Sequence, residues 1–125
     1  MSELTVGVLG LGQGRSHLQA FQAITGSRVV AVCDQDAGLA QRVAQQYNIT
    51  KICATYDQML DDKTIDIIVV ATPDHLHGQH AIQGLEAGKH VLSEIPMATT
   101  MAEVERIVAI TDRTGLKYQM GNQVR

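Results

Sequence analysis

A short apolar run, a glycine-rich turn and the start of an amphipathic segment follow one another near the N-terminus of the sequence. The run begins at Thr5, and the turn contains Gly10, Gly12 and Gly14. Glycines allow a tight turn and a close approach of a ligand phosphate, and the N-terminus of a following helix attracts anions. The pattern predicts a buried parallel strand that leads into a helix through a pyrophosphate-binding loop.

Asp34 is the acidic residue that such a loop requires. It follows a second apolar run, Arg28–Cys33, and lies 22 residues after Gly12. In a dinucleotide-binding fold, an acid at about this distance accepts hydrogen bonds from ribose hydroxyls. It also repels a 2′-phosphate, and Gln35 and Asp36 offer no compensating cation, so the sequence favours NAD over NADP. The alternative is a plain βαβ unit whose glycines only form the turn.

The composition excludes several classes of protein. The 125 residues are 45% hydrophobic but only 3% aromatic, with a net charge of −3. This length predicts one domain, residues 1–125, with an aliphatic core. A nucleic-acid surface would need clustered basic residues and stacking rings, and a membrane span would need about 20 consecutive apolar residues. Neither is present in the sequence.

The N-terminus and the cysteines favour the cytoplasm. Met1–Leu4 leads directly into the first predicted strand without the pattern of a signal peptide. Cys33 and Cys53 fall at the end of one predicted strand and within another. In a reducing compartment we expect packed, reduced thiols here; a disulfide or redox pair is the alternative.

Six apolar runs alternate with helical patterns along the chain. This alternation predicts a Rossmann-type α/β fold with a doubly wound parallel sheet in the strand order 3-2-1-4-5-6 and helices on both faces. After the first strand, we expect strands at 28–33, 52–54, 65–71, 90–94 and 116–120, and helices at 13–24, 36–48, 57–60, 75–87 and 100–114.

Two helices carry more detailed expectations. Asp74 is placed to cap the helix that begins at His75. Thr100 and Glu103 form a capping box for the last helix. The apolar spacing in that helix predicts a buried face made of Met101, Val104, Ile107 and Val108.

The carboxyl ends of five of these strands face one crevice in this topology. Ligands bind at that edge of a doubly wound sheet. The strand ends deliver Gly10–Gly14, Asp34, Thr72–His75, Glu94–Pro96 and Gly121–Gln123 to it.

Several blocks together resemble the N-terminal half of the glucose–fructose oxidoreductase / inositol dehydrogenase (Gfo/Idh/MocA) family, over essentially the whole chain. The blocks are Val6–Gly12, Ala31–Asp34, Ala71–His77, Gly84–Glu94 and Gly121–Gln123. The resemblance implies a domain that binds NAD or NADP, in an oxidoreductase that transfers hydride between the cofactor and a sugar, polyol or related hydroxy compound. In that family a second, C-terminal domain supplies much of the sugar site and usually the contacts of a homo-oligomer.

The resemblance also implies the residues of the site. Glu94 would position cofactor or substrate near the nicotinamide, or else cap a helix N-terminus, and His77 matches the family's histidine; both are possible contributors to catalysis. Arg15 would reach the pyrophosphate, or else be a surface arginine. The full set of expected cofactor-binding residues is Gly10, Leu11, Gly12, Gln13, Gly14, Arg15, Asp34, Thr72, Pro73, His75, His77, Glu94 and Asn122.

The chain departs from the family pattern in three places. The third glycine of the loop is Gly14, one residue early, and Arg15 holds its usual position. Ile95 replaces the lysine of the family's Glu-Lys-Pro block, which lies near the nicotinamide and the reacting hydroxyl. The sequence stops at Arg125, where the family's second domain would begin, so this chain alone is not expected to be catalytically complete. A piece of a longer protein and a stand-alone domain remain open alternatives.

Two other functions and a metal site compete with this interpretation. A nucleotide-binding or sensing homologue that has lost its chemistry is favoured by Ile95. A methyltransferase would share the Gly10-x-Gly12-x-Gly14 spacing, but Val8 stands where its loop usually carries an acid. The nearby histidines do not predict a metal site, because no cysteine or carboxylate completes the set formed by His75, His77 and His80.

Overall fold

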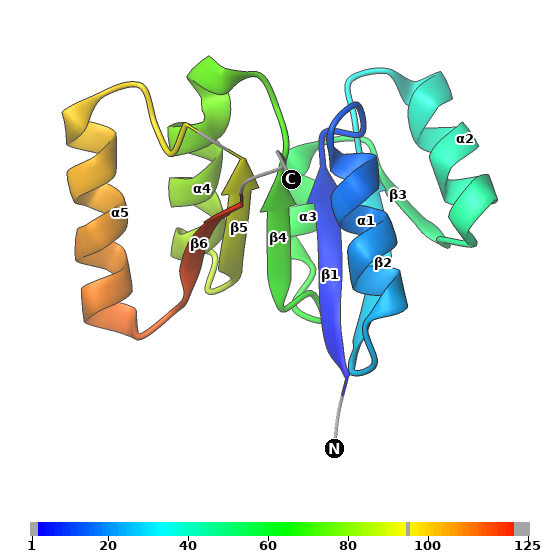
Figure 1. Cartoon of the computed structure of the whole chain (residues 1–125), viewed down its shortest axis with the longest axis horizontal. Coiled ribbons are helices and arrows are strands. Elements are labelled where there is room, and N and C mark those ends of the chain that lie inside the picture. Colours follow the sequence, from blue (N-terminus) through cyan, green and yellow to red (C-terminus); the bar gives the residue numbers. More distant parts are fainter. Residues whose placement is uncertain (1–2, 95, 122–125) are drawn as a thin grey trace.

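The computed structural model describes residues 3–94 and 96–121, folded as a three-layer α/β unit (Figure 1). The strands are β1 Leu4–Leu9, β2 Ser27–Cys33, β3 Lys51–Cys53, β4 Ile67–Val70, β5 His90–Glu94 and β6 Tyr118–Gly121. The helices are α1 Gly14–Ala23, α2 Ala37–Tyr47, α3 Tyr56–Asp61, α4 His77–Glu86 and α5 Met101–Thr114.

All six strands are parallel, in the order β3-β2-β1-β4-β5-β6. The predicted doubly wound Rossmann sheet is therefore confirmed. The order reverses at β1, from which β2 and β4 continue the sheet in opposite directions. A crevice for a ligand forms at such a switch point, outside the carboxyl ends of the strands.

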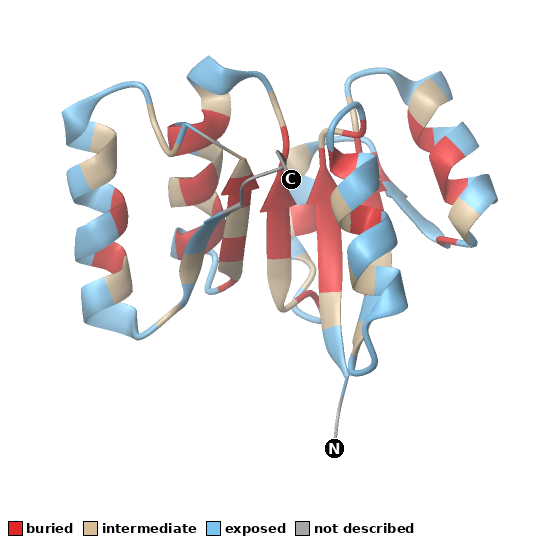
Figure 2. Ribbon diagram, in the orientation of Figure 1, coloured by how far each residue is buried: buried red, intermediate tan, exposed pale blue. Residues whose placement is uncertain are grey.

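Helices cover the two faces of the sheet in two separate apolar clusters. On one face, Leu18 of α1 and Val43 of α2 pack against strand residues such as Val8. On the other face, helices α3, α4 and α5 contribute Met59, Leu85, Ile107 and Ile110. Figure 2 shows the resulting red, buried strip along the middle strands. Strands buried on both faces read as continuous aliphatic runs, which is why their positions could be predicted from the sequence.

Most predicted elements are present, with boundaries that differ by a few residues, as expected for frayed ends. The fourth helix is the main exception. Asp74–Leu76 forms a short 3₁₀ turn and the α-helix begins only at His77. Asp74 makes no capping hydrogen bond there, so its predicted role as a helix cap was wrong.

The buried face predicted for the last helix is confirmed only in part, since Ile107 is buried and Val104 is half-buried. Met101 and Val108 are 70% and 47% exposed, whereas Ile107 and Ile110 are fully buried. The face that meets the sheet is centred on Ile107 and Ile110, and successive residues point about 100° apart around a helix, so Val108 is turned away from it. The N-terminal cap is confirmed, since Thr100 Oγ1 accepts a hydrogen bond from the Glu103 backbone N–H at 3.2 Å.

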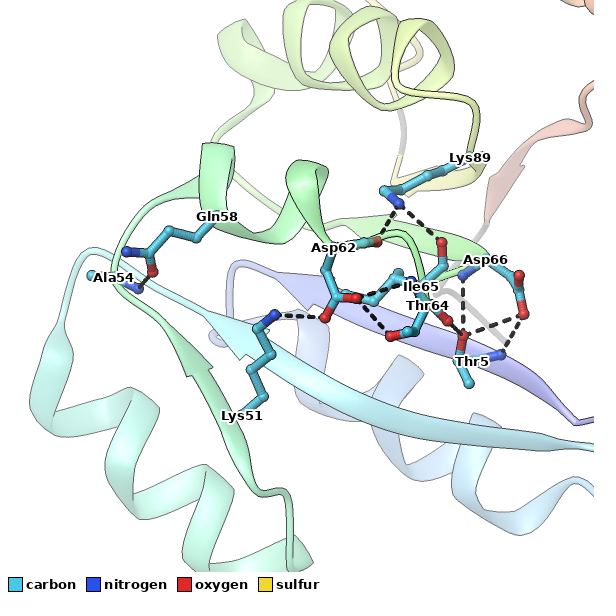
Figure 3. Close-up of polar contacts among 9 residues, drawn as sticks. All are labelled: Thr5, Lys51, Ala54, Gln58, Asp62, Thr64, Ile65, Asp66 and Lys89. Atoms are coloured by element: carbon cyan, nitrogen blue, oxygen red, sulfur yellow. Dashed lines mark hydrogen bonds and ion pairs between the residues drawn. The ribbon is translucent and has the colours of Figure 1, made fainter.

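A polar network fastens the amino-terminal edge of the sheet, shown in Figure 3. Lys89 is 3% exposed, and its Nζ donates hydrogen bonds to the backbone carbonyls of Asp62 at 2.7 Å and Ile65 at 3.0 Å. A cavity of about 580 Å³ lies at this edge, lined by Lys89 and Asp66 among others. A doubly wound fold binds its ligand outside the carboxyl ends of the strands, which is the opposite edge of the sheet from this cavity.

Cys33 and Cys53 are both buried free thiols, as predicted, and are register partners on the adjacent strands β2 and β3. Burial raises the pKa of the Cys33 thiol to about 11, with the neighbouring Cys53 and Asp34 adding to the effect. These cysteines are therefore protonated packing residues at neutral pH. No helix within residues 3–94 and 96–121 has the length and apolar character required to cross a membrane.

Candidate functional site

The glycine-rich loop joins β1 to α1 at the switch point and approaches β4 closely. Gly10 has a φ of +90°, and a Cβ on it would lie 2.5 Å from the carbonyl oxygen of Ala71. Only glycine fits this position without strain. By contrast, a Cβ on Gly12 would have no neighbour within 4 Å. The loop therefore packs against β4 at Gly10 and leaves an open backbone surface at Gly12.

Gly14 begins α1 and lies against β1. A Cβ on Gly14 would approach Val8 Cγ1 to 2.8 Å. This close packing of helix on strand is the role of the third glycine in dinucleotide-binding loops. The loop is thus one residue shorter than Gly-x-Gly-x-x-Gly, but its third glycine still lets the helix approach the strand.

Asp34 directly follows β2, and its carboxylate is tied to the glycine-rich loop. Oδ2 accepts a hydrogen bond from the Leu11 backbone N–H at 2.7 Å, and Oδ1 accepts one from the Asp36 N–H at 2.8 Å. A carboxylate can accept about four hydrogen bonds. Asp34 can therefore hold the loop in place and still accept hydrogen bonds from a ligand.

A cavity of about 260 Å³ opens beside Asp34, between the carboxyl ends of β1, β2 and β4. It brings together three of the predicted site residues, Gly10, Asp34 and Thr72. Most of the remaining wall was not predicted. The other lining residues are Leu9, Cys33, Gln35, Ala54, Thr55, Tyr56, Leu76 and His80.

Tyr56 and His80 form another part of the cavity wall. Their rings meet edge to face with centroids 5.1 Å apart, and the Tyr56 hydroxyl donates a hydrogen bond to the His80 carbonyl at 2.7 Å. His80 Nδ1 lies 3.0 Å from Thr72 Oγ1. Burial raises the pKa of Tyr56 and lowers the pKa of His80, so both wall residues favour their neutral forms.

Several predicted residues lie at the same edge of the sheet but outside this cavity. Gln13 and Arg15 are exposed at the start of α1, and Pro73 and His75 are exposed on the turn after β4. Leu11 is fully buried and reaches the site only through its backbone N–H. Ile95 and Asn122 lie outside the described residues.

Glu94, at the end of β5, is held by a residue that sequence reasoning missed. His17 Nε2 lies 2.5 Å from Glu94 Oε2, and the two side chains are only 14% and 12% exposed. The contact reaches from α1 to β5, over the intervening strand β4. A signal for His17 did exist, since residues 14, 17 and 18 share one helical face and Gly14 and Leu18 both pack on the sheet.

His77 is buried, with an exposure of 1%, and does not line the cavity. Its Nε2 lies 2.6 Å from the Thr72 carbonyl oxygen and its Nδ1 lies 2.7 Å from the Pro96 carbonyl oxygen. The expected role of His77 as a direct cofactor ligand has no support in this geometry. Within the described part of the chain, no three His, Cys, Asp or Glu side chains gather in the manner of a metal site.

Known proteins resemble this chain in both sequence and fold. A family model described as "Oxidoreductase family, NAD-binding Rossmann fold" matches residues 4–122. Inositol 2-dehydrogenase of Salmonella typhimurium is 32% identical over 115 residues, which are 90% of this chain and 34% of that enzyme. The chain thus spans about a third of the length of this relative.

Solved structures of similar proteins include complexes with either nicotinamide dinucleotide. GenD2 from gentamicin A biosynthesis, solved with NAD, has a TM-score of 0.91 and 28% identity, over 97% of this chain and 35% of that one. The 3-ketoreductase KijD10 from Actinomadura kijaniata, solved with TDP-benzene and NADP, has a TM-score of 0.86 and 27% identity, over 95% and 38%. With its glycine-rich loop, its strand order and the match over residues 4–122, the chain belongs to the Gfo/Idh/MocA oxidoreductase family, as its NAD-binding Rossmann domain.

Proposed function

We propose that this chain binds NAD at the edge formed by Gly10–Gly14 and Asp34, as the cofactor domain of an enzyme that transfers hydride to or from a hydroxy compound. The observation that carries the proposal is the position of Asp34. Its carboxylate is fastened to the Leu11 N–H and forms part of the cavity wall at the same time. One acid thus organises the phosphate loop and faces the place where a ribose would lie.

In this arrangement the pyrophosphate lies over Gly12, where the backbone is open and the N-terminus of α1 favours an anion. The adenosine ribose donates its hydroxyl hydrogen bonds to Asp34, and the nearby wall of Leu76 and His80 contacts the adenosine. The nicotinamide extends towards Thr72 and Glu94, at the ends of β4 and β5. Bound NAD supplies the hydride acceptor, and these side chains orient its ring.

NAD is the preferred cofactor in this proposal. A 2′-phosphate would enter beside the Asp34 carboxylate, and the exposed neighbours Gln35 and Asp36 carry no positive charge to balance it. Exposed Arg15 lies on α1, beside the proposed place of the pyrophosphate. The similar structures include NAD and NADP complexes alike, so Asp34 is the feature on which the preference depends.

We assign the substrate to the class of sugars, polyols or related hydroxy compounds. The similarity to an inositol 2-dehydrogenase supports this class. The residues that select the substrate are proposed to lie outside these 125 residues, since the chain covers only 34% of that relative. The cavity beside Asp34 is taken up by the cofactor in this arrangement.

A second candidate, a nucleotide-binding homologue without hydride transfer, is favoured by one observation, Ile95 in place of the family lysine. An assay for NADH formation with myo-inositol and other polyols separates the two, in a form of the protein that includes the proposed substrate-selecting residues. If Ile95 marks lost chemistry, Ile95→Lys raises the rate. An unchanged or lower rate in an already active protein contradicts that candidate.

The NAD preference is tested by titrating the chain with NADH and NADPH, followed by their fluorescence. The wild type should bind NADH at least about tenfold more tightly than NADPH, the equivalent of about 1.4 kcal/mol. Asp34→Asn should weaken NADH binding and reduce the ratio of NADH affinity to NADPH affinity. Asp112→Asn, at an exposed acid on α5, should change neither the NADH affinity nor this ratio. Equal affinities for both cofactors in the wild type would contradict the role of Asp34.

A further inference from the structure

We propose that His77 is a positioning residue, whose imidazole is protonated on both nitrogens and straps the turn after β4 to the backbone at Pro96. These two contacts of His77, with the carbonyls of Thr72 and Pro96, are called the strap below, and they are independent of the proposed function. Only their consequence for cofactor binding rests on that function.

The two partners of His77 determine its protonation state. Nε2 lies 2.6 Å from the carbonyl oxygen of Thr72, and Nδ1 lies 2.7 Å from the carbonyl oxygen of Pro96. A carbonyl oxygen can only accept a hydrogen bond, and a neutral imidazole carries a single N–H. A neutral ring would place a nitrogen lone pair against a carbonyl lone pair at hydrogen-bond distance, in a side chain that is 1% exposed. Only the imidazolium donates to both carbonyls.

The charged and titratable groups around His77 are compatible with a buried cation. From α5, the Glu103 carboxylate approaches the next residue of α4, Gly78, so closely that a Cβ on Gly78 would lie 2.5 Å from Oε1. From α4 itself, His80 is the nearest titratable group. Burial and, second, the charge on His77 lower the pKa of His80, which leaves a single cation in this turn. The carbonyl oxygens of Thr72 and Pro96 accept the hydrogen bonds of that cation.

The strap connects two parts of the candidate site. Thr72 lies in the cavity wall, and its hydroxyl contacts His80. Pro96 lies two residues after Glu94, whose carboxylate contacts His17. Because His77 holds backbone carbonyls and does not line the cavity, it acts by fixing the distance between these two segments.

The protonation state can be measured without any ligand, by ¹⁵N NMR of the histidine rings in the wild-type chain at pH 7. The proposal expects both ring nitrogens of His77 to show the shifts of protonated nitrogens, and His80 to show those of a neutral ring. One protonated and one unprotonated nitrogen in His77 would overturn the proposal, whatever the chain binds.

Two substitutions then remove the two hydrogen bonds of His77 one at a time. In His77→Asn the amide nitrogen can replace Nδ1 and donate to Pro96, and in His77→Gln it can replace Nε2 and donate to Thr72. Each should weaken NADH binding about tenfold, which corresponds to about 1.4 kcal/mol, the size of one lost hydrogen bond. The matched control is His90→Asn, at the amino end of β5, where His90 Nδ1 accepts a hydrogen bond from the Lys117 N–H.

The outcomes distinguish the strap from the proposed function. If the His77→Asn and His77→Gln variants fold and bind NADH as tightly as the wild type, the positioning role is overturned. A loss of affinity equal to that of the His90→Asn control would also overturn it, because the effect would then be general destabilisation. A wild-type chain that binds no NADH contradicts the proposed function alone, and the NMR measurement still decides the strap.

Discussion

His17 Nε2 lies 2.5 Å from Glu94 Oε2, which joins two residues 77 positions apart in the sequence. His17 is on the helix that follows the glycine-rich loop, and Glu94 ends β5. The contact therefore ties the proposed phosphate-binding end of the site to its proposed nicotinamide end. Both side chains are largely buried, so water competes little for their hydrogen bond.

A double-mutant cycle measures this interaction directly. The variants His17→Ala, Glu94→Ala and the double variant should give a coupling free energy of about 1–3 kcal/mol in urea unfolding. The control cycle uses Glu3 and Arg28, whose contact of 3.3 Å joins side chains more than half exposed. That pair should couple by less than about 1 kcal/mol. Equal coupling in the two cycles would show that the His17–Glu94 contact stabilises the fold no more than an exposed ion pair does.

Two glycines of the loop should respond to the same substitution in opposite ways. Gly14→Ala places a Cβ 2.8 Å from Val8 Cγ1 and should lower the free energy of unfolding by about 1–3 kcal/mol. Gly12→Ala meets no atom within 4 Å and should leave stability nearly unchanged, yet weaken NADH binding by crowding the pyrophosphate. Urea unfolding and NADH titration of both variants test this. A stable Gly14→Ala variant would show that the helix can move away from β1.

The thiol of Cys33 should be unreactive in the folded protein. Burial, then Cys53 and Asp34, raise its pKa from 9.0 to about 11. At about pH 8 we expect iodoacetamide to modify Cys33 much more slowly in buffer than in urea, because the reagent needs the thiolate. Mass spectrometry over time measures both rates, and similar rates would contradict the burial of the thiol.

The raised pKa of Cys33 also makes the free energy of unfolding depend on pH. The unfolded chain releases the Cys33 proton near a pKa of 9.0, and the folded protein releases it only near a pKa of about 11. The folded state holds more protons in this window, so the free energy of unfolding falls as pH rises through it. Cys33→Ala should have a shallower slope than the wild type in urea unfolding between about pH 8.5 and about pH 10.5. Identical slopes would argue against this thiol as a source of the pH dependence.

The two lysines of the amino-terminal edge should differ strongly in their contribution to stability. Lys89→Met removes the donor to two backbone carbonyls, that of Ile65 being buried and that of Asp62 partly buried, and should cost about 1–3 kcal/mol. Lys51→Met removes an ion pair of 2.5 Å with Asp62, but the Lys51 side chain is 43% exposed, so the cost should stay below about 1 kcal/mol. Thermal or urea unfolding compares the two. A larger loss for Lys51→Met would contradict the structural role of Lys89.

The fold could be predicted from the sequence because its signals are local and repeated. The strands β1, β2 and β4 are rich in aliphatic residues, and helices with an apolar face separate them. The buried face of α5, predicted correctly at Ile107 but wrongly at Met101 and Val108, shows the limit of this reasoning. Spacing identifies Ile107 and Val108 equally as apolar, but only packing against the sheet decides that Ile107 is the buried one.

The candidate site could be predicted only in part. Gly10 and Asp34 were found because the loop and the acid follow a known spacing along the chain. His17 and Tyr56 were missed because their partners, Glu94 and His80, are distant in sequence and meet only when β4 and β5 take their places in the sheet. His77 was noted, but its two carbonyl partners depend on backbone positions that no side-chain pattern encodes.

Calorimetric titration of the unmodified chain with NAD, NADH and NADP measures directly whether the edge formed by Gly10–Gly14 and Asp34 binds a dinucleotide. We expect NAD and NADH to bind with one site per chain and NADP to bind much more weakly, because the Asp34 carboxylate in the cavity wall is proposed to face the adenosine ribose. Binding of none of the three, by a chain shown to be folded, would contradict a cofactor site built from the glycine-rich loop and Asp34.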